Sequence, residues 1–163
     1  MSGDAPLRVR TYEPRDRDAC LAVFDSNVPG SFLAFERPAF EEFLDRDDRE
    51  YLVIEGDGAI VACGGYAVTP GTTTADLCWG MVVEDRQRTG LGRMLVEQRL
   101  ARIAADTTIT HVAMNTSHET RAFYEKLGFT TVQVTTDGIA PGLHRCDMIM
   151  DAQRIRSHAP SSS

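Results

Sequence analysis

The residues best suited to chemistry lie in one short polar stretch, EDRQRTGLGR, between the apolar run WGMVV and the amphipathic segment MLVEQRLARI. Gly90 and Gly92 let the backbone approach a ligand without a Cβ in the way. The first turn of a following helix offers unpaired N–H groups and the positive end of the helix dipole. Arg86, Arg88 and Arg93 add positive charge. The stretch predicts a strand, a loop that binds phosphate or pyrophosphate, and a helix. A Gly-containing turn with solvated arginines is the alternative.

Two common phosphate-binding motifs do not fit this loop. A dinucleotide fingerprint G-x-G-x-x-G that starts at Gly90 requires glycine at position 95, where the chain has Leu95. A Walker loop requires Gly-Lys-Ser/Thr, which the sequence lacks. A nucleotide-binding regulatory domain is therefore disfavoured. The remaining pattern is Gln87-x-x-Gly90-x-Gly92, placed after a predicted strand and at the start of a predicted helix.

The elements that must position this loop alternate between strands and helices. Asp57-Gly58 between two apolar runs predicts a hairpin, and Thr116-x-x-Glu119 predicts a capping box. The Gly64-Gly65 pair suggests a bulge or a close approach. We expect strands at 7–11, 51–55, 59–68, 76–83, 111–115, 130–136 and 144–150, with a turn over 137–142. Helices are expected from 14, from 38, after Gly90, and from the capping box to Gly128. This order predicts a mixed α/β sheet with helices on its faces, in one domain over residues 1–150, and a flexible tail over 151–163.

Composition narrows the class of protein. The 163 residues are 42% hydrophobic and 25% charged, which is ordinary for a globular domain. A net charge of −7 argues against nucleic acid as a partner. No apolar run suits a membrane span or a secretory signal. The four cysteines form no C-x-x-C pair and the four histidines are scattered. We therefore expect no membrane partner, no metal and a cytoplasmic location.

Two motifs together resemble one known family. The pattern Gln87-x-x-Gly90-x-Gly92 resembles the Gln/Arg-x-x-Gly-x-Gly/Ala signature of the GCN5-related N-acetyltransferase (GNAT) superfamily. About thirty residues later, FYEKLGF over residues 123–129 resembles a second motif of that family. The resemblance covers residues 51–150. It implies an α/β (α+β) fold of the GNAT type, with a mixed, mostly antiparallel sheet of about six to seven strands and about four helices. It also implies acetyl-CoA, bound between the strand ending near Val83 and the strand ending near Asn115.

The resemblance also implies a set of cofactor-binding residues. The backbone of Val82 and Val83 would pair with the pantetheine arm, and the amides of residues 88–93 would hold the pyrophosphate. Ser117 stands where relatives often carry Asn, seven residues before the Tyr. The complete implied set is Val82, Val83, Gln87, Arg88, Thr89, Gly90, Leu91, Gly92, Arg93, Ser117 and Tyr124.

Acetyl transfer to a primary amine by direct attack in a ternary complex sets the chemical requirements. A backbone N–H near Val82 would stabilise the oxyanion. The resemblance places Tyr124 as the acid that protonates the departing thiolate. Tyr124 as a core aromatic is the alternative, although Phe123 and Leu127 already supply an apolar face. Asp76 stands where some relatives carry a Glu base, and a solvated polar residue is the alternative there.

The acceptor is the least constrained part of the hypothesis. It would lie between residues 27–37 and 137–143 and would be a small-molecule or peptide amine. Glu36, Glu41 and Glu42 would favour a cationic amine, or simply form a solvated helix face. A non-catalytic acyl-CoA-binding sensor is the competing function. A sheet edge over residues 130–150 makes a homodimer possible.

Overall fold

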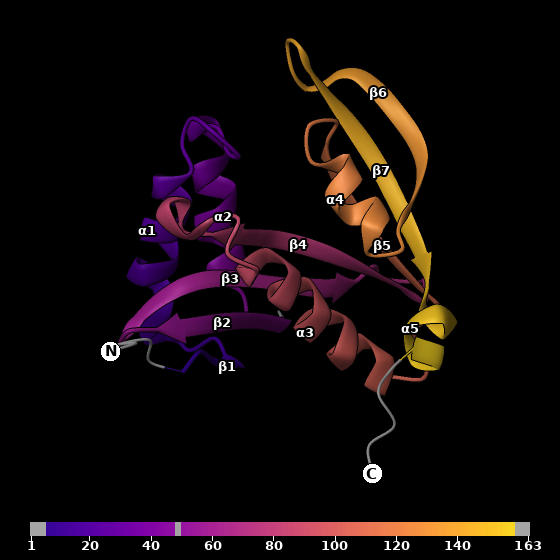
Figure 1. The fold of residues 1–163 in the computed structure, drawn as a ribbon, viewed down its shortest axis with the longest axis horizontal. Helices are drawn as coiled ribbons and strands as arrows, with labels where there is room; N and C mark the ends of the chain where they lie inside the picture. The colour runs from indigo at the N-terminus through magenta and orange to yellow at the C-terminus, as the bar shows by residue number, and fades with distance from the viewer. Residues whose placement is uncertain (1–5, 48–49, 159–163) are drawn as a thin grey trace. The chain divides into compact units, whose positions relative to one another are not determined.

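The computed structural model describes residues 6–47 and 50–158 (Figure 1). Over these residues the chain forms seven strands and five α-helices. The elements are β1 (Arg8–Thr11), α1 (Arg17–Ser26), α2 (Arg37–Leu44), β2 (Glu50–Gly56), β3 (Ala59–Val68), β4 (Thr74–Val82), α3 (Leu91–Ala105), β5 (His111–Ser117), α4 (Arg121–Lys126), β6 (Thr130–Ala140), β7 (Leu143–Asp151) and α5 (Ala152–His158). Short 3-10 turns occur at η1 (Pro14–Asp16), η2 (Ala34–Glu36) and η3 (Glu84–Arg86).

The strands form one sheet in the order β1-β2-β3-β4-β5-β7-β6. The β4–β5 pair is parallel, whereas β1–β2, β2–β3, β5–β7 and β6–β7 are antiparallel. This confirms the predicted α/β fold with a mixed, mostly antiparallel sheet. Contacts divide the chain into two compact units. The first extends to Ala67 and resumes over Cys78–Leu100, and the second comprises Val68–Leu77 and the described residues from Ala101 onward.

In the first unit, side chains of β2 and β3 contribute to two apolar clusters, with a register shift between Ile54 and Glu55 opposite Val61. One cluster joins Tyr51, Val53 and Cys63 to residues of α1 and α2. The other joins Ile54, Val61 and Ala62 to Leu91 and Leu95 of α3. The start of α3 is thus fixed by buried apolar side chains, which holds the preceding loop in place. The predicted hairpin is confirmed, because Asp57 and Gly58 form its two-residue turn with φ values of 54° and 78°.

In the second unit, β5 is the central strand. It pairs in parallel with Thr74–Asp76 of β4 through residues 111–113, and antiparallel with β7 over its whole length. Strand β6 pairs with β7 and ends the sheet. The buried side chains of this unit include Val112, Met114, Cys146, Met148 and Phe129.

Two local predictions were wrong. Helix α4 begins at Arg121, and Thr116 lies in β5 with its hydroxyl bonded to the hydroxyl of Thr120, so the predicted capping box does not form. Strand β6 continues to Ala140, which pairs with Leu143, so the hairpin turn is two residues long instead of spanning 137–142. In β5, continuous pairing with β7 extends the strand to Ser117, whereas β6 has an irregularity between Thr135 and Ala140 before its last pair.

A short helix, α5, occupies most of the expected tail. Ala152 is fully buried, and Arg156 donates hydrogen bonds to the carbonyl oxygens of Ala104, Asp106 and Ile109 at 3.1, 2.6 and 3.0 Å. Of the tail that was expected to be flexible, residues 152–158 therefore form a helix, and residues 159–163 lie outside the described residues.

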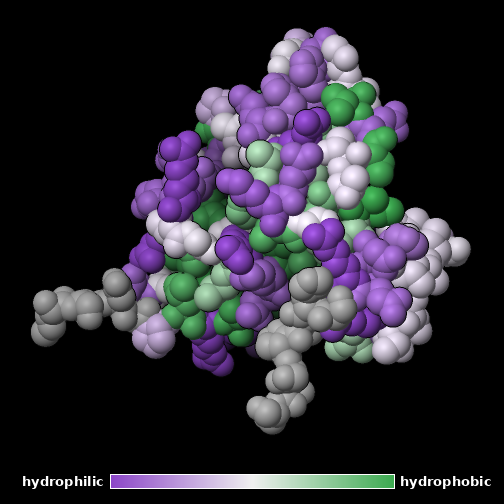
Figure 2. Space-filling model, turned by 45° about the vertical axis from the view of Figure 1, so that its right-hand side comes forward, coloured by the Kyte–Doolittle hydropathy of each residue, from purple (hydrophilic) through white to green (hydrophobic). Residues whose placement is uncertain are grey.

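The surface in Figure 2 is mixed, with hydrophobic residues interspersed among hydrophilic ones. Within residues 6–47 and 50–156, three large apolar side chains are at least half exposed, namely Phe35, Val132 and Val134 at 72%, 62% and 50%. Among the residues that the structure describes, no helix has the length and apolar character needed to span a bilayer. The same residues contain no group of three or more His, Cys, Asp or Glu side chains placed to hold a metal ion.

Candidate functional site

The polar loop connects β4 to α3 and ends in an exposed helix N-terminus. Arg88 and Gly90 both have positive φ values, 65° and 93°. Glycine adopts this conformation without strain, whereas it is uncommon for arginine. The carbonyl of Gly90 accepts the first helical hydrogen bond from the amide of Met94 at 3.0 Å, and Leu91 is buried just inside the helix. The amides of the first turn therefore follow directly on an exposed loop, as anion binding requires.

The three arginines of the loop do not share one arrangement. Arg86 donates to Asp57 at 2.5 Å and so extends toward the β2–β3 turn. Arg93 pairs with Glu97, one helical turn later, at 3.3 Å. Arg88 is exposed. Because Arg86 and Arg93 already pair with carboxylates, an anion at this loop would rely first on amides and the helix dipole, with Arg88 as the nearest support.

Gln87 holds the loop to the end of helix α1. Its side-chain amide donates to the Oδ1 of Asn27, and it lies 3.5 Å from the carbonyl oxygen of Val82. Asn27 is only 3% exposed, and its Nδ2 donates to the carbonyls of Val23 and Val82, both at 2.9 Å. From the sequence, residue 27 was expected only at the start of the acceptor segment 27–37, because its partners Val82 and Gln87 lie 55 and 60 residues away.

The backbone of Val82 and Val83 faces in different directions. The Val83 amide donates to the Val61 carbonyl at 2.8 Å, and the Val83 carbonyl accepts from the Arg86 amide at 2.9 Å. Successive residues of a strand direct their backbone groups to opposite sides. The N–H of Val82 therefore points away from β3, which makes it better placed than Val83 to meet a ligand.

Strand β4 contains a backbone irregularity at Trp79. Its φ of 48° is rare for a large aromatic residue in a strand. The buried hydroxyl of Tyr51 donates to the Trp79 carbonyl at 2.7 Å, and the indole packs against Phe32 and Phe40, with ring centroids 6.0 and 5.1 Å away. Such a local twist changes the direction of the residues that follow in the strand.

Two different neighbours explain the Gly64-Gly65 pair: a Cβ added at Gly65 would overlap the Glu50 carbonyl oxygen, and Gly64 lies against a buried arginine. Arg99 of α3 is 2% exposed and donates to the Gly65 carbonyl at 3.3 Å. A Cβ added at Gly64 would lie 3.2 Å from the Arg99 guanidinium carbon, and one added at Gly80 would lie 2.8 Å from its Nη2. The close approach that the sequence suggested is therefore present, between two strands and a helix.

Three predicted site residues, Asp76, Ser117 and Tyr124, lie in the second unit. Tyr124 is half-buried and packs edge-to-face on Phe123 and Phe129, with centroids 5.0 and 6.1 Å apart. Phe123 is exposed at 39%, so the apolar face expected from Phe123 is supplied by buried Phe129 instead. Ser117 ends β5, with its hydroxyl 3.5 Å from that of Thr120.

The carboxylate of Asp76 already has a partner. It accepts a hydrogen bond from the hydroxyl of Thr69, in the connection before β4. Asp76 itself is half-buried and pairs with Ala113 in the parallel ladder. One carboxylate oxygen is thus engaged, and a proton-accepting role would fall to the other.

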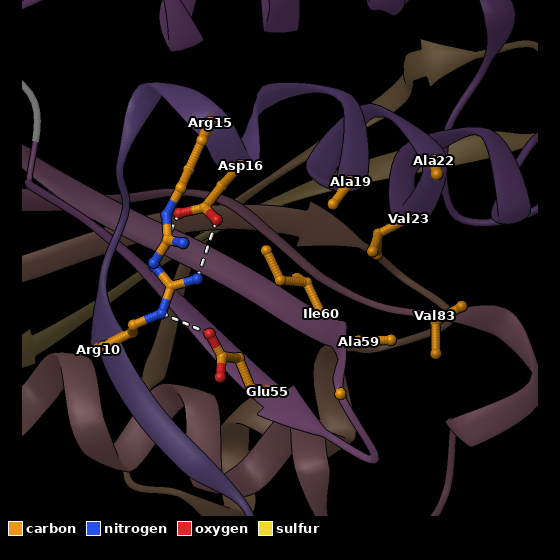
Figure 3. Close-up of a pocket in the computed structure, with 11 residues that line it drawn as sticks. Arg10, Arg15, Asp16, Ala19, Ala22, Val23, Glu55, Ala59, Ile60 and Val83 are labelled. Atoms are coloured by element: carbon orange, nitrogen blue, oxygen red, sulfur yellow. Dashed lines mark hydrogen bonds and ion pairs between the residues drawn. The ribbon is translucent and has the colours of Figure 1, made fainter.

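The described residues of the first unit line two pockets that bear on the site. One, of about 580 Å³, lies between α1 and the β2–β3 hairpin (Figure 3). At one end the Arg10 guanidinium lies between Asp16 and Glu55, and the other end is lined by apolar side chains. The second, of about 380 Å³, is lined by residues 26–31, Glu84 and Gln87, and we call it the 26–31 pocket. Glu84 is its single ionisable lining residue.

Comparison with known families decides the class of protein. Residues 47–131, slightly more than half of the chain, match the acetyltransferase (GNAT) domain model. This chain belongs to the GNAT acetyltransferase family. The matched segment of the GNAT domain contains Gln87, Gly90, Gly92 and Tyr124. A search of curated proteins finds no significant match.

Solved structures agree with the GNAT fold. A protein from Desulfovibrio desulfuricans described as an acetyltransferase of the GNAT family is 24% identical, with a TM-score of 0.78 over 90% of this chain and 99% of the other. The ribosomal-protein-S18-alanine N-acetyltransferase from Escherichia coli is 18% identical, with a TM-score of 0.75 over 90% and 94%. An aminoglycoside 6'-N-acetyltransferase complexed with coenzyme A is 14% identical, with a TM-score of 0.75 over 96% and 99%.

Proposed function

We propose that this protein is an N-acetyltransferase that moves the acetyl group of acetyl-CoA to a primary amine of a small molecule or peptide. The observation that carries the proposal is the exposed loop at Gly90, which opens α3 within the matched GNAT domain. Two similar structures act, by their names, on a protein alanine and on an aminoglycoside, and the latter is complexed with coenzyme A. These names are consistent with an amine acceptor and with coenzyme A as the acyl carrier.

For the cofactor, we assign the pyrophosphate to the amides of residues 88–93 at the start of α3. Arg88 would add charge, and the N–H of Val82 would meet the thioester oxygen. Val83 takes a smaller part than the family resemblance implies, because both its backbone groups already have partners. Ser117 would contact the pantetheine arm through its hydroxyl.

For the reaction, the amine nitrogen attacks the thioester carbon within a ternary complex and the C–S bond breaks. The proton lost by the amine passes to Asp76 through solvent, and Tyr124 donates its phenolic proton to the thiolate. The N–H of Val82 stabilises the oxyanion that forms between these two steps. A non-catalytic acyl-CoA sensor would need the loop but not Tyr124.

The contacts of the acidic residues change which carboxylate we expect to attract the acceptor amine. Glu36 accepts a hydrogen bond from the amide of Leu33 at 2.8 Å, and Glu41 pairs with Arg37 at 3.0 Å. Both therefore serve the α1–α2 segment itself. Glu42 is exposed on α2, whereas Glu84 lines the 26–31 pocket and is the carboxylate better placed to attract a cation. We therefore expect acceptors whose cationic amino group is attracted by Glu84.

The decisive experiment measures thiol release from acetyl-CoA with a panel of mono- and diamines, amino acids and peptides, alongside CoA binding by calorimetry. Acceptor-dependent thiol release supports the enzyme, whereas tight CoA binding without release on any acceptor supports the sensor. Glu84→Gln should raise KM for cationic acceptors about twofold to fivefold, the upper part of the usual range for one solvated ion pair. Asp85→Asn is the matched control, since Asp85 neighbours Glu84 but does not line the pocket.

The homodimer is also a proposal. Strand β6 is the last strand in the sheet order, and its residues Val132 and Val134 are exposed. Unpaired edge strands with apolar side chains are templates for pairing with another chain. A monomeric mass by light scattering at working concentration would remove this proposal.

A further inference from the structure

The C-terminus of α1 is joined to the β4–α3 connection by three side-chain contacts. Asn27 donates to the Val82 carbonyl at 2.9 Å and accepts from the Gln87 amide. The hydroxyl of Ser26 accepts from the backbone amide of Glu84 at 3.1 Å. All these residues belong to the first unit. Residues at the end of one helix thus fix three successive points of the connection that carries the cofactor motif.

Asn27 has every side-chain hydrogen-bonding group engaged. Its Nδ2 donates to two carbonyls, those of Val23 and Val82, and its Oδ1 accepts from Gln87. At 3% exposure, water cannot replace these partners easily. A buried polar group that is fully satisfied specifies one geometry, because any rearrangement leaves a group unpaired.

The contact with Val82 fixes the orientation of a peptide plane. The carbonyl of Val82 and the amide of Val83 belong to the same rigid peptide unit. Asn27 holds its oxygen, and the Val61 carbonyl holds its N–H at 2.8 Å. The backbone that leads into the loop therefore has a fixed direction where it leaves the strand.

Asn27 also organises the segment on its other side. Its carbonyl oxygen accepts from the amides of Gly30 and Phe32 at 2.7 and 3.2 Å. Residues 27–31 line the 26–31 pocket together with Gln87. One residue thus bonds to the turn after α1 through its backbone and to the cofactor motif through its side chain.

We propose that Asn27 is a positioning residue that holds the Gln87–Gly90 loop in the conformation that binds the cofactor pyrophosphate. It acts through Gln87 and through the Val82 peptide, and does not itself touch the cofactor. The proposal rests on the proposed function, in which this loop binds the pyrophosphate of CoA. An asparagine is required because both carbonyls need a donor while Gln87 needs an acceptor, and one amide of this length provides both.

The test replaces Asn27 with Asp, which keeps the shape but loses both donors. Loss of a buried hydrogen bond typically costs enough to weaken binding about tenfold. Asn27→Asp should raise the dissociation constant of CoA and the KM for acetyl-CoA about tenfold, with kcat changed less than about twofold. Hydrogen exchange of the amides of residues 86–93 should become faster. Gln133→Glu, the same amide-to-carboxylate change on exposed β6, should leave all three measurements unchanged.

A double-mutant cycle tests whether Asn27 acts through Gln87. Because Asp keeps the acceptor for the Gln87 amide, the cycle uses Asn27→Ala, whose effect on CoA binding should be smaller in a Gln87→Ala background than in the wild type. Fully additive effects would overturn the proposal, as would wild-type affinity and wild-type exchange rates in Asn27→Asp. Asn27→Ser, which is smaller and uncharged, repeats the test if Asn27→Asp does not fold. A wild-type protein that binds no CoA would refute the proposed function, and the exchange rates would then show separately whether Asn27 orders the loop.

Discussion

The hydroxyl of Tyr51 donates a 2.7 Å hydrogen bond to the carbonyl oxygen of Trp79, the residue of β4 with a φ of 48°. Burial raises the pKa of Tyr51 well above its ordinary value, so the phenol keeps its proton throughout the pH range in which enzymes are assayed. The hydrogen bond joins a core side chain of β2 to the irregular point of the strand that leads to Val82. It offsets part of the cost of holding a bulky residue in the left-handed region.

Tyr51→Phe should therefore reduce turnover as well as stability. The Trp79 carbonyl loses its donor, at a cost of about 1–2 kcal/mol in the free energy of unfolding, or roughly 2–8 °C in Tm. The strand beyond Trp79 relaxes and misplaces the Val82 amide, so kcat should fall about tenfold. Phe43→Leu is the control, because Phe43 packs on Tyr51 without contacting this hydrogen bond. It should lower Tm and leave kcat unchanged. Equal effects of both variants on kcat would show that only packing matters.

Tyr124→Phe tests the proposed acid. The ring packing on Phe123 and Phe129 is retained, and only the hydroxyl is lost. Steady-state kinetics should show kcat lowered about 10²–10⁴-fold, the usual contribution of general acid catalysis, with a much smaller change in KM for acetyl-CoA. Turnover equal to that of the wild type would instead identify Tyr124 as a structural aromatic.

The sequence predicted what local chemistry determines. Asp57-Gly58 dictates its own turn, and Gln87, Gly90 and Gly92 mark the loop before α3 because glycine and helix ends have local signatures. It could not predict the positive φ of Trp79, because tryptophan rarely adopts the left-handed region and no neighbouring residue indicates it. It also gave no sign of the Asn27–Gln87 contact, because the partners are brought together by the fold. The charge of Arg86 was expected to serve the anion-binding loop, but the fold of the hairpin brings Asp57 close enough to pair with it.

Asp16→Asn should destabilise the protein in a pH-dependent way. Hydrogen bonds from Arg10, at 2.8 and 2.9 Å, hold the pKa of Asp16 below its ordinary value. A lowered folded-state pKa stabilises the protein above the unfolded pKa of about 3.9, and this contribution disappears as pH falls through the folded value. The variant should lose about 2 kcal/mol at pH 7 by urea unfolding, and the difference should shrink below about pH 4. Asp18→Asn, exposed on α1, should cost only a few tenths of a kcal/mol at either pH. A difference that is constant with pH would contradict the assignment to the Arg10 interaction.

Arg156→Ala tests whether α5 is part of the folded domain. The guanidinium donates to the carbonyls of Ala104, Asp106 and Ile109, which follow α3 or end it. These carbonyls include helix C-terminal acceptors that lack an intrahelical donor, and a cation near them is favoured by the helix dipole. Removing the side chain should lower the free energy of unfolding by about 1–2 kcal/mol, or roughly 2–8 °C in Tm. Gln153→Ala, an exposed position on the same helix, should change Tm by less than about 1 °C. If both variants melt like the wild type, α5 does not contribute to stability and the segment after Met150 behaves as the flexible tail that its composition indicates.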